Sequence, residues 1–156
     1  MQKPSWDEYF MSVAHAVKAR ASCVRRQVGA VIVRNKQIIS TGYNGTPRGV
    51  KNCNENGCER CNAPPEMIPR GTGLDHCSCC HGEENAIVQA ALHGMRTEGA
   101  TLFTTNSPCT TCAKMAINAG VSRIVFGGTY PDELGAKLLK EAGIELIQVV
   151  SKESLL

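Results

Sequence analysis

The chain has 156 residues, 42% of them hydrophobic and 20% charged, which is typical of a soluble protein of one domain. Its net charge of +3 is too small to indicate binding to nucleic acid or to a membrane surface. The sequence has no apolar run long enough to cross a bilayer and begins without the apolar core of a secretion signal, so we expect no membrane span and a cytoplasmic location.

The first predicted elements are a helix and a β-hairpin. Ser5 can cap a helix over residues 5–21, because its side chain can accept a hydrogen bond from a first-turn amide. Residues 28–33 and 37–41 have the composition of strands, and Asn35-Lys36 between them can form the turn. The sequence therefore predicts an antiparallel strand pair after the first helix.

A long segment without periodicity follows the hairpin. Residues 42–80 are rich in Gly, Pro, Asn and Cys. Because so long a structureless segment is unusual inside a compact domain, we expect something other than an apolar core to order it. We interpret the whole chain, 1–156, as a single domain with a cysteine-rich loop insertion at about 44–80.

Helices and strands are predicted to alternate in the remainder of the chain. Such alternation indicates a parallel sheet covered by helices. Ala86, Ile87, Ala90, Ala91 and Leu92 are expected to form the buried stripe of the first of these helices. The predicted helices are 83–95, 109–119 and 132–142, and the predicted strands are 101–105, 121–126 and 144–150.

Cysteine is the unusual feature of the composition. The odd count, without a secretion signal, argues against a disulfide framework and favours metal binding in a reducing compartment. Isolated cysteines could equally be small apolar residues. The nine are Cys23, Cys53, Cys58, Cys61, Cys77, Cys79, Cys80, Cys109 and Cys112.

Two short motifs can together form a catalytic zinc site. Cys109 and Cys112 are spaced to face one ion from the start of a helix, where the helix dipole favours thiolates. His81 can supply the third protein ligand, which leaves the fourth position open for water. Glu83, two positions after His81, is expected to move protons rather than to bind the metal. A redox cysteine pair or a structural zinc knuckle would not require this His-x-Glu partner.

His-x-Glu followed by Pro-Cys-x-x-Cys is the signature of zinc-dependent nucleobase deaminases. Over most of its length the chain resembles the deoxycytidylate (dCMP) deaminase branch of the cytidine deaminase superfamily. One departure is Gly82, where that branch usually has alanine; both functional side chains of the motif remain in place. The stretches that carry the resemblance are VGAVIV (28–33), TGYNGTPRG (41–49), HGEENAI (81–87) and SPCTTC (107–112).

The resemblance implies a fold and a reaction. The fold would be a three-layer α/β structure, with a mixed central sheet of about five strands flanked by helices. The reaction would be hydrolytic deamination of dCMP to dUMP with release of ammonia, which supplies dUMP for thymidylate synthesis. Water would attack C4 of the pyrimidine, and Glu83 would protonate N3 and then the leaving amine.

Two alternatives to this reaction stay open. A related deaminase could act on another aminated nucleotide, nucleoside or base. A non-catalytic zinc module could instead bind nucleic acid, but the basic residues are scattered and few aromatic residues are available for stacking on bases. We therefore expect a nucleotide substrate and no nucleic-acid partner.

The resemblance also implies substrate contacts. Asn44 would bind the deoxyribose, and Arg26 would bind the 5′-phosphate through its guanidinium group. Arg26 could equally be a solvated surface charge, and Arg48 is a second phosphate candidate. Residues expected to border the substrate are Thr46, Pro47, Arg48, Thr105 and Ser107.

Some members of the branch carry a second, structural zinc. The matching positions here are Cys23, Cys53, Cys58 and Cys77, a closed set of four thiolates that would order the long loop. Alternative sets use Cys61, His76 or Cys79, and some of these thiols could be free. Many relatives are homohexamers activated by dCTP and inhibited by dTTP, so the resemblance implies a homo-oligomer with these possible effectors.

Overall fold

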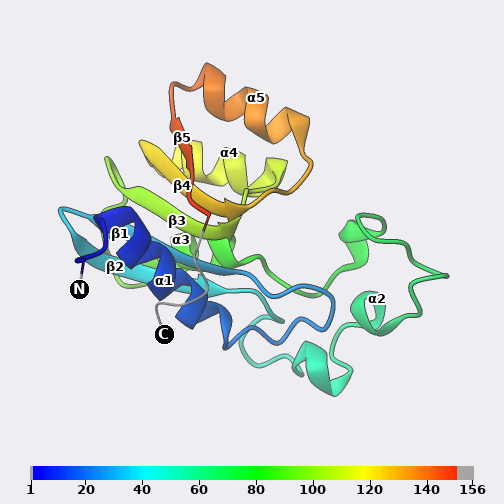
Figure 1. Ribbon diagram of the computed structural model, residues 1–156. Coiled ribbons are helices and arrows are strands. Elements are labelled where there is room, and N and C mark those ends of the chain that lie inside the picture. Colours follow the sequence, from blue (N-terminus) through cyan, green and yellow to red (C-terminus); the bar gives the residue numbers. More distant parts are fainter. Residues whose placement is uncertain (1, 151–156) are drawn as a thin grey trace.

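A computed structural model describes residues 2–150 of the chain, and these form a five-stranded sheet with helices on both faces (Figure 1). The strands are β1 (Gly29–Arg34), β2 (Gln37–Tyr43), β3 (Thr101–Asn106), β4 (Arg123–Gly128) and β5 (Glu145–Gln148), in the spatial order β2-β1-β3-β4-β5. The helices are α1 (Trp6–Lys18), α2 (Glu59–Asn62), α3 (Gly82–Leu92), α4 (Thr110–Asn118) and α5 (Glu133–Glu141), with short 3₁₀ turns η1 (Cys53–Glu55) and η2 (Leu74–His76).

The sheet is mixed, as predicted. β1 pairs in antiparallel fashion with both β2 and β3, whereas β3, β4 and β5 are parallel to one another. The β1–β2 turn is made by Asn35 and Lys36, whose φ angles of 51° and 59° are both positive. Positive φ at both central residues gives the turn the hand that continues the twist of the two strands.

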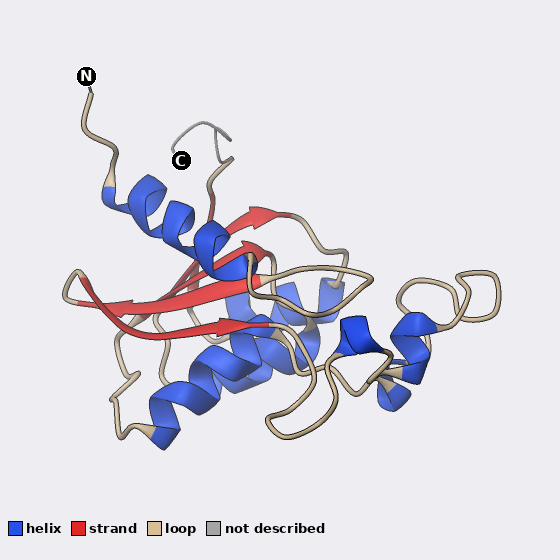
Figure 2. Ribbon diagram, turned by 90° about the horizontal axis from the view of Figure 1, so that it is seen from below, coloured by secondary structure: helices blue, strands red, loops and turns tan. Residues whose placement is uncertain are grey.

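Two apolar clusters give the fold three layers (Figure 2). Alternate residues of each strand face opposite sides, so Val31 and Phe103 pack against α1, whereas Ile32 and Leu102 pack against the other helices. The cluster beneath α1 also contains Phe10, Met11, Ala14, Val33 and Val125. The cluster on the opposite face includes Ala86 of α3, Ala113 and Ala116 of α4, Ile124 of β4 and Leu139 of α5.

The buried stripe predicted for α3 was wrong in its last part. Ala86 and Ala90 are fully buried and Ile87 partly so, but Ala91 is exposed and the Leu92 side chain is 60% exposed. The helix ends at Leu92 rather than at residue 95, so these two residues belong to its last turn. The contact with the sheet is instead made by small residues, because α3 lies close to the β2 backbone.

The cysteine-rich insertion extends away from the sheet. Its ordered pieces are η1, α2 and η2, and Figure 1 shows them at one side of the molecule, beyond the ends of β1 and β2. Their apolar contacts are made largely by cysteine side chains, which form a separate buried cluster. None of the helices described for residues 2–150 combines the length and the apolarity that crossing a membrane requires.

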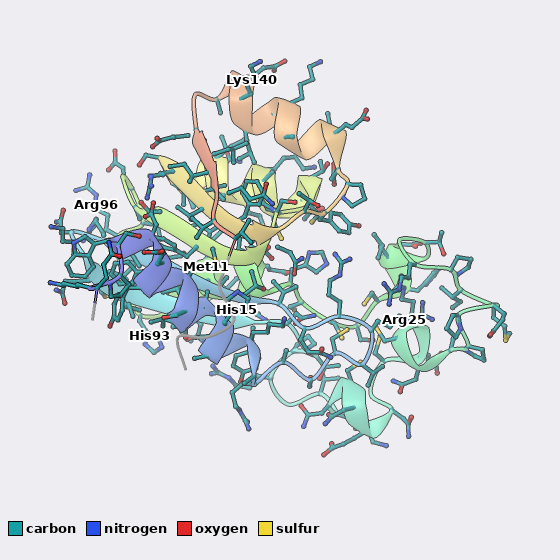
Figure 3. The ribbon with its side chains drawn as sticks, in the orientation of Figure 1. Met11, His15, Arg25, His93, Arg96 and Lys140 are labelled. Carbon is teal, nitrogen blue, oxygen red and sulfur yellow. The ribbon has the colours of Figure 1, made fainter. Side chains whose placement is uncertain are left out.

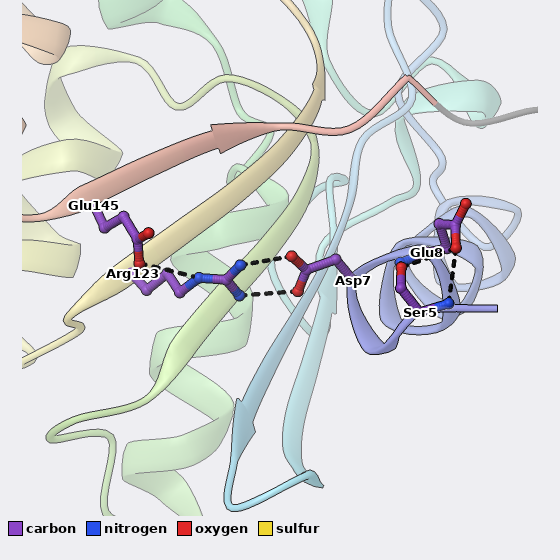
Figure 4. Close-up of polar contacts among 5 residues, drawn as sticks. All are labelled: Ser5, Asp7, Glu8, Arg123 and Glu145. Atoms are coloured by element: carbon purple, nitrogen blue, oxygen red, sulfur yellow. Dashed lines mark hydrogen bonds and ion pairs between the residues drawn. The ribbon is translucent and has the colours of Figure 1, made fainter.

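A bidentate ion pair joins the first helix to the parallel half of the sheet (Figure 4). The Arg123 guanidinium on β4 donates two hydrogen bonds to the Asp7 carboxylate, at 2.9 and 2.5 Å. Its Nε lies 3.2 Å from a carboxylate oxygen of Glu145 on β5. Because about three quarters of the Asp7 and Arg123 side chains are shielded from solvent, this pair is screened less than an exposed one.

We expect Asp7→Asn to lower the free energy of unfolding by about 1 kcal/mol, since it removes a partly buried bidentate carboxylate. Urea denaturation followed by circular dichroism measures the change. Glu141→Gln is the matched control, because Glu141 pairs with Lys137 on an exposed helix face. Its expected cost is about 0.4 kcal/mol or less. Equal costs for the two variants would contradict a special role for Asp7.

Candidate metal centre and adjoining pocket

The position of His81 is set by the start of α3. His81 is the N-cap residue of this helix, and its backbone N–H donates to the Glu84 carboxylate at 3.0 Å. The helix lies so close to β2 that a Cβ atom on Gly42 would be 2.2 Å from the carbonyl oxygen of Gly82. Only glycine fits there. A Cβ on Gly82 would come within 3.1 Å of the Val28 carbonyl oxygen, so an alanine at this position would require a small shift.

The two cysteines of the second motif lie at the start of α4, directly after β3. Cys109 is the N-cap residue of α4, and Cys112 lies one turn further on, fully buried. Asp132, the N-cap of α5, accepts hydrogen bonds from the backbone N–H groups of Thr110 and Gly135, at 2.7 and 3.0 Å. This carboxylate therefore ties the start of α4 to the start of α5.

His81, Cys109 and Cys112 meet at one point. The Nδ1 atom of His81 is 3.3 Å from each of the two sulfurs, and the three donor atoms all lie within 4.8 Å of one another. Tetrahedral zinc with ordinary Zn–N and Zn–S bonds would separate such donors by about 3.6 Å. Hydrogen bonds from Cys112 and His81 lower the pKa of Cys109 to about 4, which favours the thiolate that a metal needs. The donor set fits zinc with one position left open.

Glu83 is buried next to these three residues. Its side chain is only 4% exposed, and burial raises the pKa of its carboxyl group. The Thr104 hydroxyl on β3 donates to Glu83 Oε1 at 2.8 Å. This contact orients the carboxylate from the sheet side, so the carboxylate can exchange protons with a molecule in the adjoining pocket.

A pocket extends from His81 and Cys109 to the cysteine-rich loop. Its walls come from the start of α3, the segment after β3, the segment after β4 and the loop. Arg26 lies on one side, with its guanidinium 5.0 Å from the centre of the Tyr130 ring. The lining also includes Asn44, Arg60, Arg70, Cys61, Cys77, Cys79, His81, Glu83, Asn106, Ser107 and Cys109.

Three of the predicted substrate residues line this pocket. Asn44 is buried, and its amide accepts a hydrogen bond from the Val28 N–H at 2.7 Å and donates to the Arg26 carbonyl at 2.6 Å. Ser107 holds the loop after β4, because its hydroxyl accepts a hydrogen bond from the Tyr130 N–H at 2.6 Å. Asn44 and Ser107 thus shape the walls, and Arg26 places a charge on them.

The other predicted contacts lie elsewhere. Thr46, Pro47 and Arg48 are not among the described residues that line the pocket, and Pro47 and Arg48 are exposed. Thr105 is buried, and its hydroxyl accepts a hydrogen bond from the Gly29 N–H, which joins β3 to the start of β1. The structure does not bring these four side chains to the pocket wall.

Sequence reasoning missed Tyr130, Arg60 and Arg70 as pocket residues. Tyr130 had a detectable signal: it follows β4, and ligands of α/β sheets bind at the carboxyl ends of neighbouring parallel strands. The two arginines come from the insertion, where the sequence shows no period that would place a side chain.

Six cysteines of the insertion region gather in a second cluster. Their donor atoms form two groups, each within 4.8 Å: Cys23, Cys53, Cys61 and Cys79 in one, and Cys58, Cys61, Cys77 and Cys79 in the other. The predicted set of Cys23, Cys53, Cys58 and Cys77 is divided between the two groups. His76, an alternative ligand, is exposed and lies beside Asp75. None of the nine cysteines forms a disulfide.

The sequence of the chain matches a known protein family. The family described as "Cytidine and deoxycytidylate deaminase zinc-binding region" matches residues 4–128, and the chain belongs to this family. The deoxycytidylate deaminase of Schizosaccharomyces pombe is 42% identical over 97% of the chain. ComE operon protein 2 of Bacillus subtilis is 37% identical over 96% of the chain and 74% of that protein.

A solved structure is similar along its whole length. The dCMP deaminase of the cyanophage S-TIM5, in complex with dCMP and dUMP, superposes with a TM-score of 0.77 at 30% identity. The match covers 96% of this chain and all of that chain. By contrast, the chain spans only 46% of the S. pombe protein and 46% of the Saccharomyces cerevisiae deoxycytidylate deaminase.

We expect His81→Ala to remove one zinc ion per chain, because two thiolates alone leave the ion without its third protein ligand. Elemental analysis of the purified protein measures the zinc content. His93→Ala is the matched control, since His93 lies at the exposed end of the same helix and hydrogen-bonds Gln89. Unchanged zinc content in His81→Ala would contradict this ligand assignment.

Proposed function

We propose that the chain catalyses the hydrolytic deamination of dCMP to dUMP, with release of ammonia. The observation that carries the proposal is the buried carboxylate of Glu83 beside a three-donor site that leaves one position open. The likeness to the cyanophage protein, whose structure was solved with dCMP and dUMP, supports this substrate. Another aminated nucleotide, nucleoside or base is the alternative, and ammonia release across such a panel distinguishes them.

Each residue has a distinct role in the proposed reaction. A zinc ion held by His81, Cys109 and Cys112 would acidify water in its open position. Glu83 takes one proton from that water and delivers it to N3 of the pyrimidine as oxygen adds at C4. It then takes the second proton from the added hydroxyl and delivers it to the amine, so ammonia leaves and the C4 carbonyl of the product forms. Thr104 keeps the Glu83 carboxylate turned toward the pocket.

Arg26 is proposed to bind the 5′-phosphate. Its guanidinium lies on the pocket wall and is held over the Tyr130 ring, so a phosphate can meet a preoriented charge. Arg48, the other phosphate candidate, is exposed and lies outside the pocket lining. Asn44 is proposed to contact the deoxyribose through the amide hydrogen that its bond to Arg26 leaves available.

Further proposals concern the whole protein. We propose that the cysteine-rich segment binds structural zinc and that the chain forms one catalytic domain, 1–156, with this segment as an insertion at about 44–80. By resemblance, the protein would be a cytoplasmic homo-oligomer, a hexamer, activated by dCTP and inhibited by dTTP. Assays of dCMP turnover with each effector, and light scattering, test these proposals.

We expect Glu83→Gln to lower kcat for dCMP by at least about 100-fold while zinc content is unchanged, because glutamine cannot transfer the proton. Ammonia release and elemental analysis provide the two readouts. Glu133→Gln, at the exposed start of α5, is the control and is expected to retain full activity. A Glu83→Gln enzyme with normal kcat would overturn the proposed mechanism.

We expect Arg26→Gln to raise KM for dCMP by about 10-fold or more, because a charge-assisted bond to the phosphate is lost. Turnover of deoxycytidine, which has no phosphate, is expected to stay the same. Steady-state kinetics with both substrates measures the difference. Arg48→Gln is the comparison variant, and a larger effect there would assign the phosphate to residues 42–49 instead.

A further inference from the structure

The six cysteines of the second cluster are too few for two separate four-thiolate sites. Two independent closed zinc sites would require eight sulfurs. The two groups nevertheless each contain four sulfurs, because both include Cys61 and Cys79. Cys23 and Cys53 belong only to the first group, and Cys58 and Cys77 only to the second.

Three sulfur–sulfur distances within the cluster match tetrahedral coordination by sulfur. A zinc ion with four ordinary Zn–S bonds separates neighbouring sulfurs by about 3.8 Å. The sulfur of Cys61 is 3.8 Å from that of Cys23 in the first group and 3.6 Å from that of Cys77 in the second. The sulfurs of Cys58 and Cys77 are 4.0 Å apart. Cys61 therefore stands at coordination distance in both groups.

Backbone amides donate to sulfurs of both groups. Backbone amides of Arg25 and Arg26 bond the Cys23 sulfur, that of Val24 bonds Cys53, and that of Ser78 donates to Cys58 at 3.3 Å. Amide donors stabilise thiolate charge, and they serve unshared sulfurs of both groups. The recorded partners of the Cys79 sulfur are the sulfurs of Cys23 and Cys53. Backbone donors therefore reach sulfurs at both ends of the cluster, as expected if both groups bind a metal ion.

A buried arginine supplies positive charge next to the cluster. Arg60 is only 7% exposed, and its Nη1 lies 4.0 Å from the Cys61 sulfur while Nε and Nη2 donate to the Thr72 carbonyl. No ion pair joins Arg60 to a carboxylate within residues 2–150. A buried charge needs a counter-charge. Six thiolates around two divalent cations carry two net negative charges, which meet this need.

Arg25, which lies beside the same cluster, forms hydrogen bonds with the backbone of the insertion (Figure 3). Its guanidinium donates to the carbonyl oxygens of Cys61, Ala63 and Ile68, at 3.1, 2.8 and 2.7 Å. Arg25 follows Cys23 by two residues, so this side chain links the segment after α1 to the insertion. The donors of the cluster are thus held by contacts that do not depend on the sulfurs themselves.

We infer that the insertion holds a dinuclear zinc–thiolate centre, in which Cys61 and Cys79 bridge two ions. Cys23 and Cys53 complete the coordination of one ion, and Cys58 and Cys77 complete that of the other. The inference rests on the proposal that the cysteine-rich segment binds zinc, and it adds the number of ions and the ligand sharing. Because Cys61, Cys77 and Cys79 also line the pocket, the centre forms part of the wall that faces the catalytic donors.

The zinc content of the full-length protein is the first test. Three zinc ions per chain are expected, one at His81, Cys109 and Cys112 and two in the insertion. Two ions per chain would overturn the dinuclear centre but leave a zinc-binding insertion. One ion, lost in His81→Ala, would overturn both statements about the insertion without affecting the proposed reaction.

Ligand sharing is tested with the NMR-active cadmium isotope in place of zinc. Two of three resonances are expected to show mutual scalar coupling, because bridging sulfurs transmit coupling between metal ions, whereas the ion at His81 stays uncoupled. Three uncoupled resonances would overturn the bridges.

Substitution of single cysteines tests the sharing independently. Cys77→Ser is expected to lose one ion and Cys61→Ser two, and equal losses would contradict sharing of Cys61. Cys80→Ser is the control, since Cys80 belongs to neither group and is expected to keep all three ions.

Discussion

The close approach of α3 to the sheet is the constraint on which the site depends. At Gly42 the helix backbone occupies the space that any side chain would need, so the start of the helix has a single position over β2. That position places His81 and Glu83 beside the end of β3, where Thr104 contacts the carboxylate and α4 begins. A displacement of this contact would separate His81 from the two cysteines, because the three donors come from two different helices.

The parallel half of the sheet supplies the second part of the arrangement. β3 and β4 end at the same edge, so the segments that follow them face each other across the pocket. Ser107 and Asp132 link these segments, one through Tyr130 and the other through the start of α4. Polar side chains thus hold in place the loops that carry Cys109 and Tyr130.

The insertion forms part of the pocket wall, together with His81 and Cys109. Arg60, Arg70 and four cysteines of the cluster are among the residues that line the pocket. Residues 44–80 have few apolar side chains in their core other than cysteines, so ordinary hydrophobic burial is a weak source of order there. In the proposed protein, metal–sulfur bonds would order the insertion instead and would hold Arg60 and Arg70 in position at the pocket.

The sequence by itself determined the local features: the order of helices and strands outside the insertion, the hairpin at Asn35-Lys36, and the two motifs that contain His81, Glu83, Cys109 and Cys112. These features follow from the spacing of residues along the chain, which can be read directly from the sequence. Only the tertiary structure decided that Arg26 rather than Arg48 lines the pocket, that Tyr130 joins it, and that Cys61 and Cys79 belong to two groups. The reason is that an aperiodic loop has no repeating pattern to place its side chains, so their partners depend on contacts between residues far apart in the chain.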